Sequence, residues 1–234
     1  MLLQSLREAV LDANLELVRR GLVLYTFGNA SGISREEKRI VIKPSGVPYE
    51  DMKPEHLVVT DLDGNIIEGK LRPSSDLPTH LVLYKAFQKI GGVAHTHSDY
   101  ATAWAQARKP IPCFGTTHAD YFHGAVPVTE VLRTEQIASE YEKNTGDAIV
   151  RAFEQLDSAA IPAVLVANHA PFTWGRDPKT AAQNAVILEA VARMAYFTLG
   201  INAEAHPVGR ELHDRHYLRK HGTDAYYGQA KDHK

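Results

Sequence analysis

The sequence predicts a single α/β domain of 234 residues. Short apolar runs of strand length alternate along the chain with segments of helical periodicity, which is typical of α/β proteins. The length falls within the range of one large domain, and a hydrophobic content of 44% is enough for a proper core. Two histidines, His95 and His97, follow one of the apolar runs, at the strand end where α/β folds tend to place their sites.

Composition narrows the classes of function. The net charge of -2 and the pI of about 6.6 give no field that favours nucleic acid or acidic membranes. No apolar run approaches the length of a membrane span, and charges at Arg7 and Glu8 come too early for a signal peptide. The one cysteine, Cys113, forms no internal disulfide and fits a reducing compartment, so we expect a cytoplasmic protein.

The first elements are a helix and a strand. Amphipathic periodicity predicts a helix over 3–20, which Gly21 ends, and the apolar run 22–25 predicts a strand. Segment 28–32 (Gly-Asn-Ala-Ser-Gly) then allows backbone N–H groups to approach an anion closely. From this segment alone, a plain turn is the better interpretation.

A second predicted strand, 39–42, leads into a cation, a hydroxyl and a glycine N–H. These groups belong to Lys43, Ser45 and Gly46, and together they are the parts of a small phosphate cradle. A type II-like turn with a solvent-facing lysine is the alternative. A third strand at 56–60 then precedes a tight Asp-Gly hairpin.

The next helix, expected through residue 87, begins after Ser74, Ser75 and Asp76. Such residues cap a helix and complement its dipole, which is the simple interpretation. They equally make an oxyanion or phosphate site, because the unpaired N–H groups of the first turn attract negative charge. Asp76 is either a cap or a metal ligand.

His95 and His97 are expected on a strand that follows a glycine pair. Side chains at i and i+2 of a strand share one face, so two imidazoles would lie side by side. Neutral imidazole is a good ligand for zinc and its neighbours. The pair alone is a weak signal, because 12 histidines in the chain make chance pairs common.

The second half of the chain adds further strand ends with ionisable groups. A loop before residue 122 contains Asp120 among small and apolar residues, and a buried strand at 163–167 ends next to His169. We also expect a short strand at 126–128. The remaining expected elements are helices starting near 134 and 147, a long helix from 177 to about 199 and a last helix at 211–220.

Taken together, these segments resemble the class II aldolase and L-ribulose-5-phosphate 4-epimerase family over almost the whole chain. The combination is specific, although each motif alone is not. The matching motifs are Gly28-Asn29, Lys43-Pro44-Ser45-Gly46, Ser74-Ser75-Asp76, His95-Thr96-His97, Gly115-Thr116-Thr117-His118-Ala119-Asp120-Tyr121, His169 before Pro171-Phe172, and the run 216–222 ahead of Tyr226-Tyr227. Ala170 stands where many epimerases have a glycine.

The resemblance implies an α/β fold with a central, largely antiparallel sheet flanked by helices. It implies one domain over 1–234, with the tail 222–234 docking at the active site, and a homotetramer with sites at subunit interfaces. It also implies one Zn²⁺ per subunit, with Mn²⁺ or Co²⁺ as alternatives.

Roles follow from the same resemblance. The implied metal ligands are Asp76, His95, His97 and His169. The implied phosphate-binding residues are Gly28, Asn29, Lys43, Ser45, Gly46, Ser74 and Ser75. Asp120 and Tyr227 are the implied acid/base pair, with His216 in the same site.

The implied activity is epimerisation at C4 of a phosphorylated ketopentose by retro-aldol cleavage and re-addition. Two alternatives remain: a class II aldolase acting on a sugar such as L-fuculose 1-phosphate, and a non-catalytic adducin-like binding module. Those aldolases carry a glutamate where Asp76 stands, and a binding module has no need of metal ligands.

Overall fold

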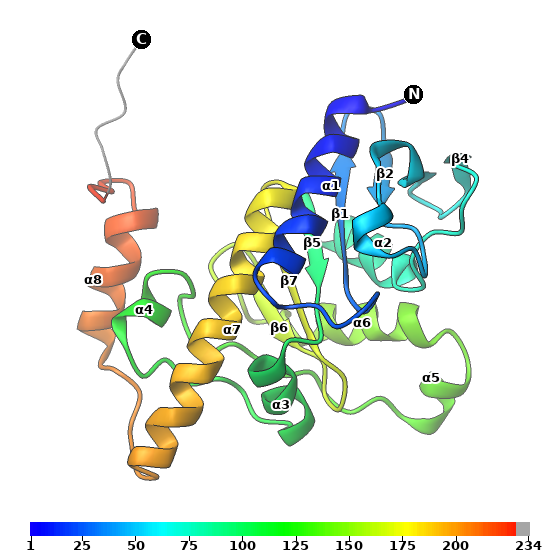
Figure 1. The fold of residues 1–234 in the computed structure, drawn as a ribbon. Helices are drawn as coiled ribbons and strands as arrows, with labels where there is room; N and C mark the ends of the chain where they lie inside the picture. Colours follow the sequence, from blue (N-terminus) through cyan, green and yellow to red (C-terminus); the bar gives the residue numbers. More distant parts are fainter. Residues whose placement is uncertain (228–234) are drawn as a thin grey trace.

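The computed structural model describes residues 1–227. In these residues seven strands form one antiparallel sheet in the order β4-β3-β2-β1-β5-β7-β6, with helices on both faces (Figure 1). The predicted fold, a single domain with a central antiparallel sheet flanked by helices, is confirmed. The strands are β1 (Asn29–Ser34), β2 (Arg39–Ile42), β3 (Val58–Asp61), β4 (Ile66–Glu68), β5 (Gly92–His95), β6 (Ala163–Leu165) and β7 (Pro171–Gly175). The helices are α1 (Gln4–Arg19), α2 (Leu77–Ala86), α3 (Asp99–Ala107), α4 (Thr116–Ala119), α5 (Thr134–Ala138), α6 (Tyr141–Ala152), α7 (Pro178–Ile201) and α8 (Arg210–His221), with short 3-10 turns η1 (Tyr49–Asp51) and η2 (Pro54–His56).

The central strands of the sheet are buried on both faces. Ile40 and Ile42 of β2 belong to a core that includes α2 and α6, whereas Val41 between them belongs to a cluster with α1. This is the alternation of a strand whose two faces are both covered. The helices α2 and α6 therefore cover one face, and α1 and α7 cover the other (Figure 1).

Two glycines let α7 approach the centre of the sheet. Gly32 of β1 and Gly92 of β5 are paired in register. A Cβ atom would lie 2.7 Å from Pro178 Cγ at Gly32 and 2.5 Å from the Asp177 carbonyl oxygen at Gly92. The Asp177 side chain accepts a hydrogen bond of 2.6 Å from the Thr180 N–H and so caps α7. This close packing fixes β5, the strand that carries His95.

By length and mean composition helix α7 could cross a membrane, although Glu189 and Arg193 interrupt its apolar residues. Its apolar character follows from its position in the fold. It packs against α1, β5 and β7, and Leu188, Val191 and Ala192 are buried in one of the cores. The apolar composition of a core helix gives the same signal as a membrane span.

Two expected strands and one expected turn differ from the structure. Residues 22–25 are not a strand, and segment 28–32, expected as a turn, runs into β1. Small polar residues have low strand propensity, but here they lie at the sheet centre, where only small side chains fit under the helices. Residues 126–128 form isolated bridges, and the chain after His169 returns as β7.

Candidate active site

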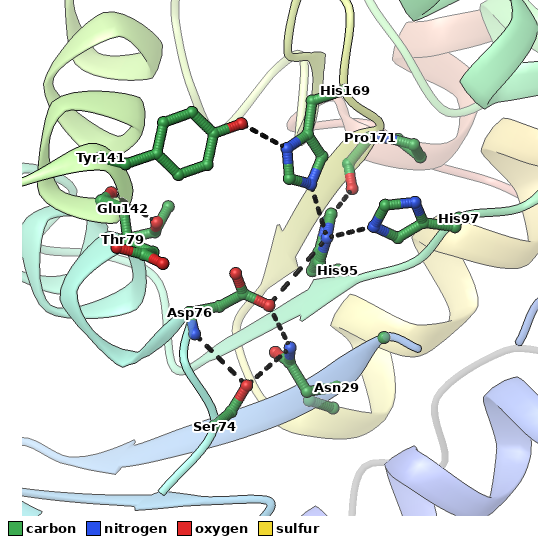
Figure 2. A network of polar contacts seen from close by, with 12 residues as sticks. Asn29, Ser74, Asp76, Thr79, His95, His97, Tyr141, Glu142, His169 and Pro171 are labelled. Atoms are coloured by element: carbon green, nitrogen blue, oxygen red, sulfur yellow. Dashed lines mark hydrogen bonds and ion pairs between the residues drawn. The ribbon is translucent and has the colours of Figure 1, made fainter. Parts of the chain in front are cut away.

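The site forms where β1 begins and β5 ends. Asn29 is paired with His95 across these two strands, and His95 is paired with Phe172 of β7 on the other side. The tight β6–β7 connection, in which Asn168 has a φ of 61°, presents His169 at the same edge. Figure 2 shows the side chains converging from β1, β5, this connection and the start of α2.

Three imidazoles meet through their Nε2 atoms. The Nε2 atom of His95 lies 3.1 Å from that of His97 and 3.2 Å from that of His169. His95 is the last residue of β5 and His97 lies beyond it, so the expectation that both lie on one strand face is wrong. The rings of His95 and His97 are nonetheless close, with centroids 4.9 Å apart and planes tilted 74° to each other. All three ligand atoms lie within 4.8 Å of one another, so the triad could hold a metal ion.

The imidazole rings of His97 and His169 are in the neutral form that metal ligands need. Burial, and to a smaller extent the neighbouring His95, lowers the pKa values of His97 and His169 to about 4. Both are therefore uncharged at neutral pH, as metal ligation requires. On the far side of its ring, His95 Nδ1 donates to the Pro171 carbonyl at 2.9 Å, which leaves Nε2 as the free lone pair.

Asp76 lies beside the triad, with Oδ2 4.0 Å from His95 Nε2. The Asn29 amide donates to this oxygen at 2.6 Å and to Ser74 Oγ at 3.1 Å, so Asn29 orients the carboxylate. Burial acts against ionisation of Asp76. Charge interactions with His95 and the Asn29 hydrogen bond outweigh it, and the pKa lies below its ordinary value. The carboxylate is thus available as a fourth ligand.

The seven predicted phosphate-binding residues line the same cavity of about 460 Å³ as Asp76 and the three histidines. Two loops are joined by backbone hydrogen bonds, from Ser74 N to Lys43 O and from Ser45 N to Arg72 O, both 2.9 Å. Gly46 has a φ of 68°, in the left-handed region that glycine adopts without strain. Ser75 is exposed at the start of α2. Hydroxyls and a glycine loop therefore surround one end of the cavity.

Lys43 is a buried cation in this cavity, only 2% exposed. Its Nζ donates to the Pro44 carbonyl at 3.2 Å and lies 4.7 Å from the centre of the Tyr49 ring. Burial lowers the pKa of Lys43 to about 8. The Tyr49 hydroxyl donates to the Gly28 carbonyl at 2.8 Å, so one tyrosine supports both the lysine and the glycine loop.

Sequence reasoning missed Tyr49 and Tyr141. Tyr141 is the first residue of α6 and lines the cavity, and its Oη lies 2.7 Å from His169 Nδ1. Burial raises the pKa of Tyr141, so the phenol is neutral at neutral pH. Periodicity gives no signal for it, because the first turn of an amphipathic helix is normally a surface position.

Asp120 and His216 meet in a second place. Asp120 Oδ1 lies 3.0 Å from His216 Nδ1, and the Arg219 guanidinium of α8 donates to both carboxylate oxygens at 3.0 and 2.8 Å. Burial raises the pKa of Asp120, but the Arg219 and His216 hydrogen bonds outweigh it, so the carboxylate titrates below its ordinary range. The Tyr227 ring, 60% exposed, stacks near Lys220 and Arg219 of the same helix.

None of Asp120, His216 and Tyr227 lines the histidine cavity in the part of the chain that the structure describes. Figure 1 places α4 and α8 on the far side of α7 from α2 and α6. The structure therefore brings the predicted ligands and phosphate-binding residues together in one site and the predicted acid/base residues together in another. Residues 228–234 of the predicted docking tail lie outside the described residues.

The chain belongs to the class II aldolase and adducin N-terminal domain family, whose model matches residues 8–196. It is 51% identical over 227 residues, 97% of this chain and 100% of the relative, to proteins named L-ribulose-5-phosphate 4-epimerase UlaF from Salmonella paratyphi B (strain ATCC BAA-1250 / SPB7) and Salmonella typhi.

Solved structures agree on the fold. The chain is similar to an L-fuculose 1-phosphate aldolase at 26% identity and a TM-score of 0.80, with 94% of this chain and 97% of that chain covered. It is similar to YgbL from Klebsiella pneumoniae at 28% identity and a TM-score of 0.72, with 91% and 97% covered.

Proposed function

We propose that this chain is a metal-dependent L-ribulose-5-phosphate 4-epimerase that interconverts L-ribulose 5-phosphate and D-xylulose 5-phosphate. One observation carries the proposal. A triad of histidines that could hold a metal opens into a cavity lined by the residues predicted to bind phosphate, in a chain half identical over its length to proteins named for this activity.

The donor set fits Zn²⁺, with Mn²⁺ or Co²⁺ as alternatives and one ion per subunit. Three imidazoles and one carboxylate are the ligand types of a catalytic zinc site with open positions. His95 is held by a hydrogen bond on the side of its ring away from the triad, as outer contacts of such sites are, and the Asp76 oxygen that faces the triad accepts a hydrogen bond from Asn29. When bound, the ion supplies Lewis acidity to sugar oxygens.

The structure of the substrate determines how its C4 centre can be inverted. In a 2-ketopentose 5-phosphate the C4 hydrogen is not next to the C2 carbonyl, so its removal gives no stabilised carbanion. Loss of the C4 hydroxyl proton instead allows the C3–C4 bond to break into the enediolate of dihydroxyacetone and glycolaldehyde phosphate. If the aldehyde carbonyl rotates and presents its other face before the C3–C4 bond re-forms, the other C4 epimer results.

Each group of residues has one task in this route. Ser45, Ser74 and Ser75, with Lys43, hold the phosphate and so retain the aldehyde while its carbonyl turns. Asp120, kept ionised by Arg219, accepts a proton on one face of the aldehyde. The Tyr227 phenol is the acid/base group on the other face.

We propose a homotetramer in which a neighbouring subunit completes each site. The support is the separation within one chain, since Asp120, His216 and Tyr227 do not line the cavity within residues 1–227. Tail 222–234 would dock at that shared site. A cytoplasmic location is proposed on the single cysteine, Cys113.

Mixed oligomers test the activity and the shared site together. His97→Asn removes a metal ligand and Asp120→Asn removes the acid/base carboxylate, so each variant alone should be nearly inactive. In co-expressed mixtures, about a quarter of shared sites combine an intact metal half with an intact Asp120 half, and activity should return to that level. Co-expression of His97→Asn with His95→Asn is the control and should restore nothing. If the first mixture is as inactive as its parents, the shared site is wrong.

An aldolase is the second candidate, favoured by the fold of the L-fuculose 1-phosphate aldolase at a TM-score of 0.80. Both activities share the bond cleavage and differ in whether the aldehyde leaves. Analysis of the sugar phosphates formed from L-ribulose 5-phosphate separates them, because an epimerase gives D-xylulose 5-phosphate and an aldolase releases free fragments.

A further inference from the structure

Tyr141 reaches the metal-binding triad from a separate helix. Its Oη lies 2.7 Å from His169 Nδ1, and the two rings are within 22° of parallel (Figure 2). Within residues 1–227, this is the hydrogen bond that the Tyr141 hydroxyl makes. The contact is on the side of the His169 ring away from the triad, because Nε2 faces His95 at 3.2 Å.

The position of Tyr141 is fixed by close packing of α6 on α2, the helix that begins beside Asp76. The Thr79 hydroxyl of α2 donates to the Glu142 carbonyl at 2.6 Å. Gly146 of α6 faces Val82, and a Cβ atom at this glycine would lie 2.7 Å from Val82 Cβ. The helices therefore hold Tyr141 and Asp76 on two sides of one cavity.

A neutral imidazole carries one proton, and this decides the direction of the Tyr141 hydrogen bond. If His169 offers the Nε2 lone pair to a cation, its proton is on Nδ1, and Nδ1–H donates to Tyr141 Oη. The phenol proton then has to go to another acceptor. Tyr141 lines the cavity of about 460 Å³ that also contains the predicted phosphate-binding residues, so that proton is directed into the cavity.

We propose that Tyr141 positions His169 for metal binding and, through the same contact, donates a hydrogen bond to an oxygen of the sugar. The donor role rests on the proposed function, whereas the positioning role concerns only the metal site. In the metal-free protein the phenol is free to donate to His169 instead, so metal binding reverses this hydrogen bond and turns Tyr141 toward the substrate.

Zinc affinity tests the positioning role without any sugar. Tyr141→Phe keeps the ring and removes only the hydroxyl, and Tyr196→Phe, on an exposed face of α7, is the matched control. In competition with a coloured chelator, the metal-free Tyr141→Phe protein should bind Zn²⁺ about tenfold more weakly, as loss of an outer contact does. Tyr196→Phe should bind as the wild type does. Wild-type affinity in Tyr141→Phe overturns the positioning role.

The proton itself can be located by ¹⁵N NMR of labelled histidine in the zinc-loaded wild type. The Nδ1 signal of His169, assigned with His169→Asn, should be that of a protonated nitrogen. A deprotonated Nδ1 overturns the proposed direction of the hydrogen bond. This result is independent of whether the protein epimerises any sugar.

Kinetics at saturating zinc test the donor role. Tyr141→Phe should raise KM for L-ribulose 5-phosphate about fivefold, the loss of one neutral hydrogen bond. An unchanged KM in a variant with weakened zinc affinity overturns the donor role and leaves only positioning. If the wild type itself does not convert the sugar, the proposed function fails, while the zinc and NMR results still decide the positioning role.

Discussion

Replacing Lys43 by methionine should stabilise the protein while weakening substrate binding. Lys43 is a 2% exposed ammonium whose polar contacts are the Pro44 carbonyl and the Tyr49 ring. A buried cation with so few partners is costly, and the phosphate of the proposed substrate would be its partner. Methionine keeps most of the apolar stem and removes the charge.

The lowered pKa of Lys43 gives the free-energy cost of burying its charge. Burial lowers the pKa of Lys43 from 10.5 to about 8. At 1.36 kcal/mol per pH unit, the charged form costs the folded, substrate-free protein about 3 kcal/mol. At pH 7 the lysine is protonated in both the folded and the unfolded chain, so the full cost is present. Above pH 8 the folded protein releases the proton first, and at pH 9.5 about 1 kcal/mol remains.

Urea unfolding of the substrate-free proteins measures this difference. Lys43→Met should have a free energy of unfolding about 3 kcal/mol higher than the wild type at pH 7 and about 1 kcal/mol higher at pH 9.5. Its KM for the phosphorylated sugar should rise about tenfold or more, because a charged partner of the phosphate is lost. A variant that is no more stable at pH 7, or whose advantage is the same at both pH values, refutes the reasoning.

Three further variants test the other residues. Ser75→Ala should raise KM for L-ribulose 5-phosphate roughly tenfold through loss of a hydrogen bond to a charged group; an equal rise for unphosphorylated L-ribulose in steady-state kinetics contradicts the phosphate assignment. Asp120→Asn keeps the shape of the side chain but removes its proton chemistry, so turnover should fall strongly while metal content, measured by atomic emission, stays at one ion per chain; normal turnover would rule out this role. Tyr227→Phe should remain folded, oligomeric and metal-loaded but lose most epimerase activity, whereas wild-type rates would leave Tyr227 as a packing anchor.

Local sequence patterns were sufficient to predict many of the helices and strands. Helices α1, α2, α7 and α8 and strands β2 and β5 lie close to where periodicity and strand-length runs predict them. Placement of histidines at strand ends was equally informative, since β5 and the β6–β7 connection bring His95 and His169 to one edge. These features depend on short segments, and short segments carry their own signal.

The remaining features depend on contacts between distant segments. Residues 29–32 form a strand because β5 pairs with them on one side and β2 pairs with β1 from Ser31 on the other, which their small polar residues do not indicate. Tyr141 reaches His169 only because α6 packs closely on α2 through Gly146. The separation of Asp120 from the cavity follows from how α8 lies against α4. In the proposed homotetramer, a neighbouring subunit would bring Asp120 to the cavity.

The most direct test of the central claim is the reaction itself. Zinc-loaded protein incubated with L-ribulose 5-phosphate should produce D-xylulose 5-phosphate up to an equilibrium mixture, seen by NMR of the sugar phosphates. A chelator should stop the reaction, and added Zn²⁺ should restore it. Accumulation of glycolaldehyde phosphate and dihydroxyacetone without the epimer, or conversion that persists after the metal is removed, would contradict the account.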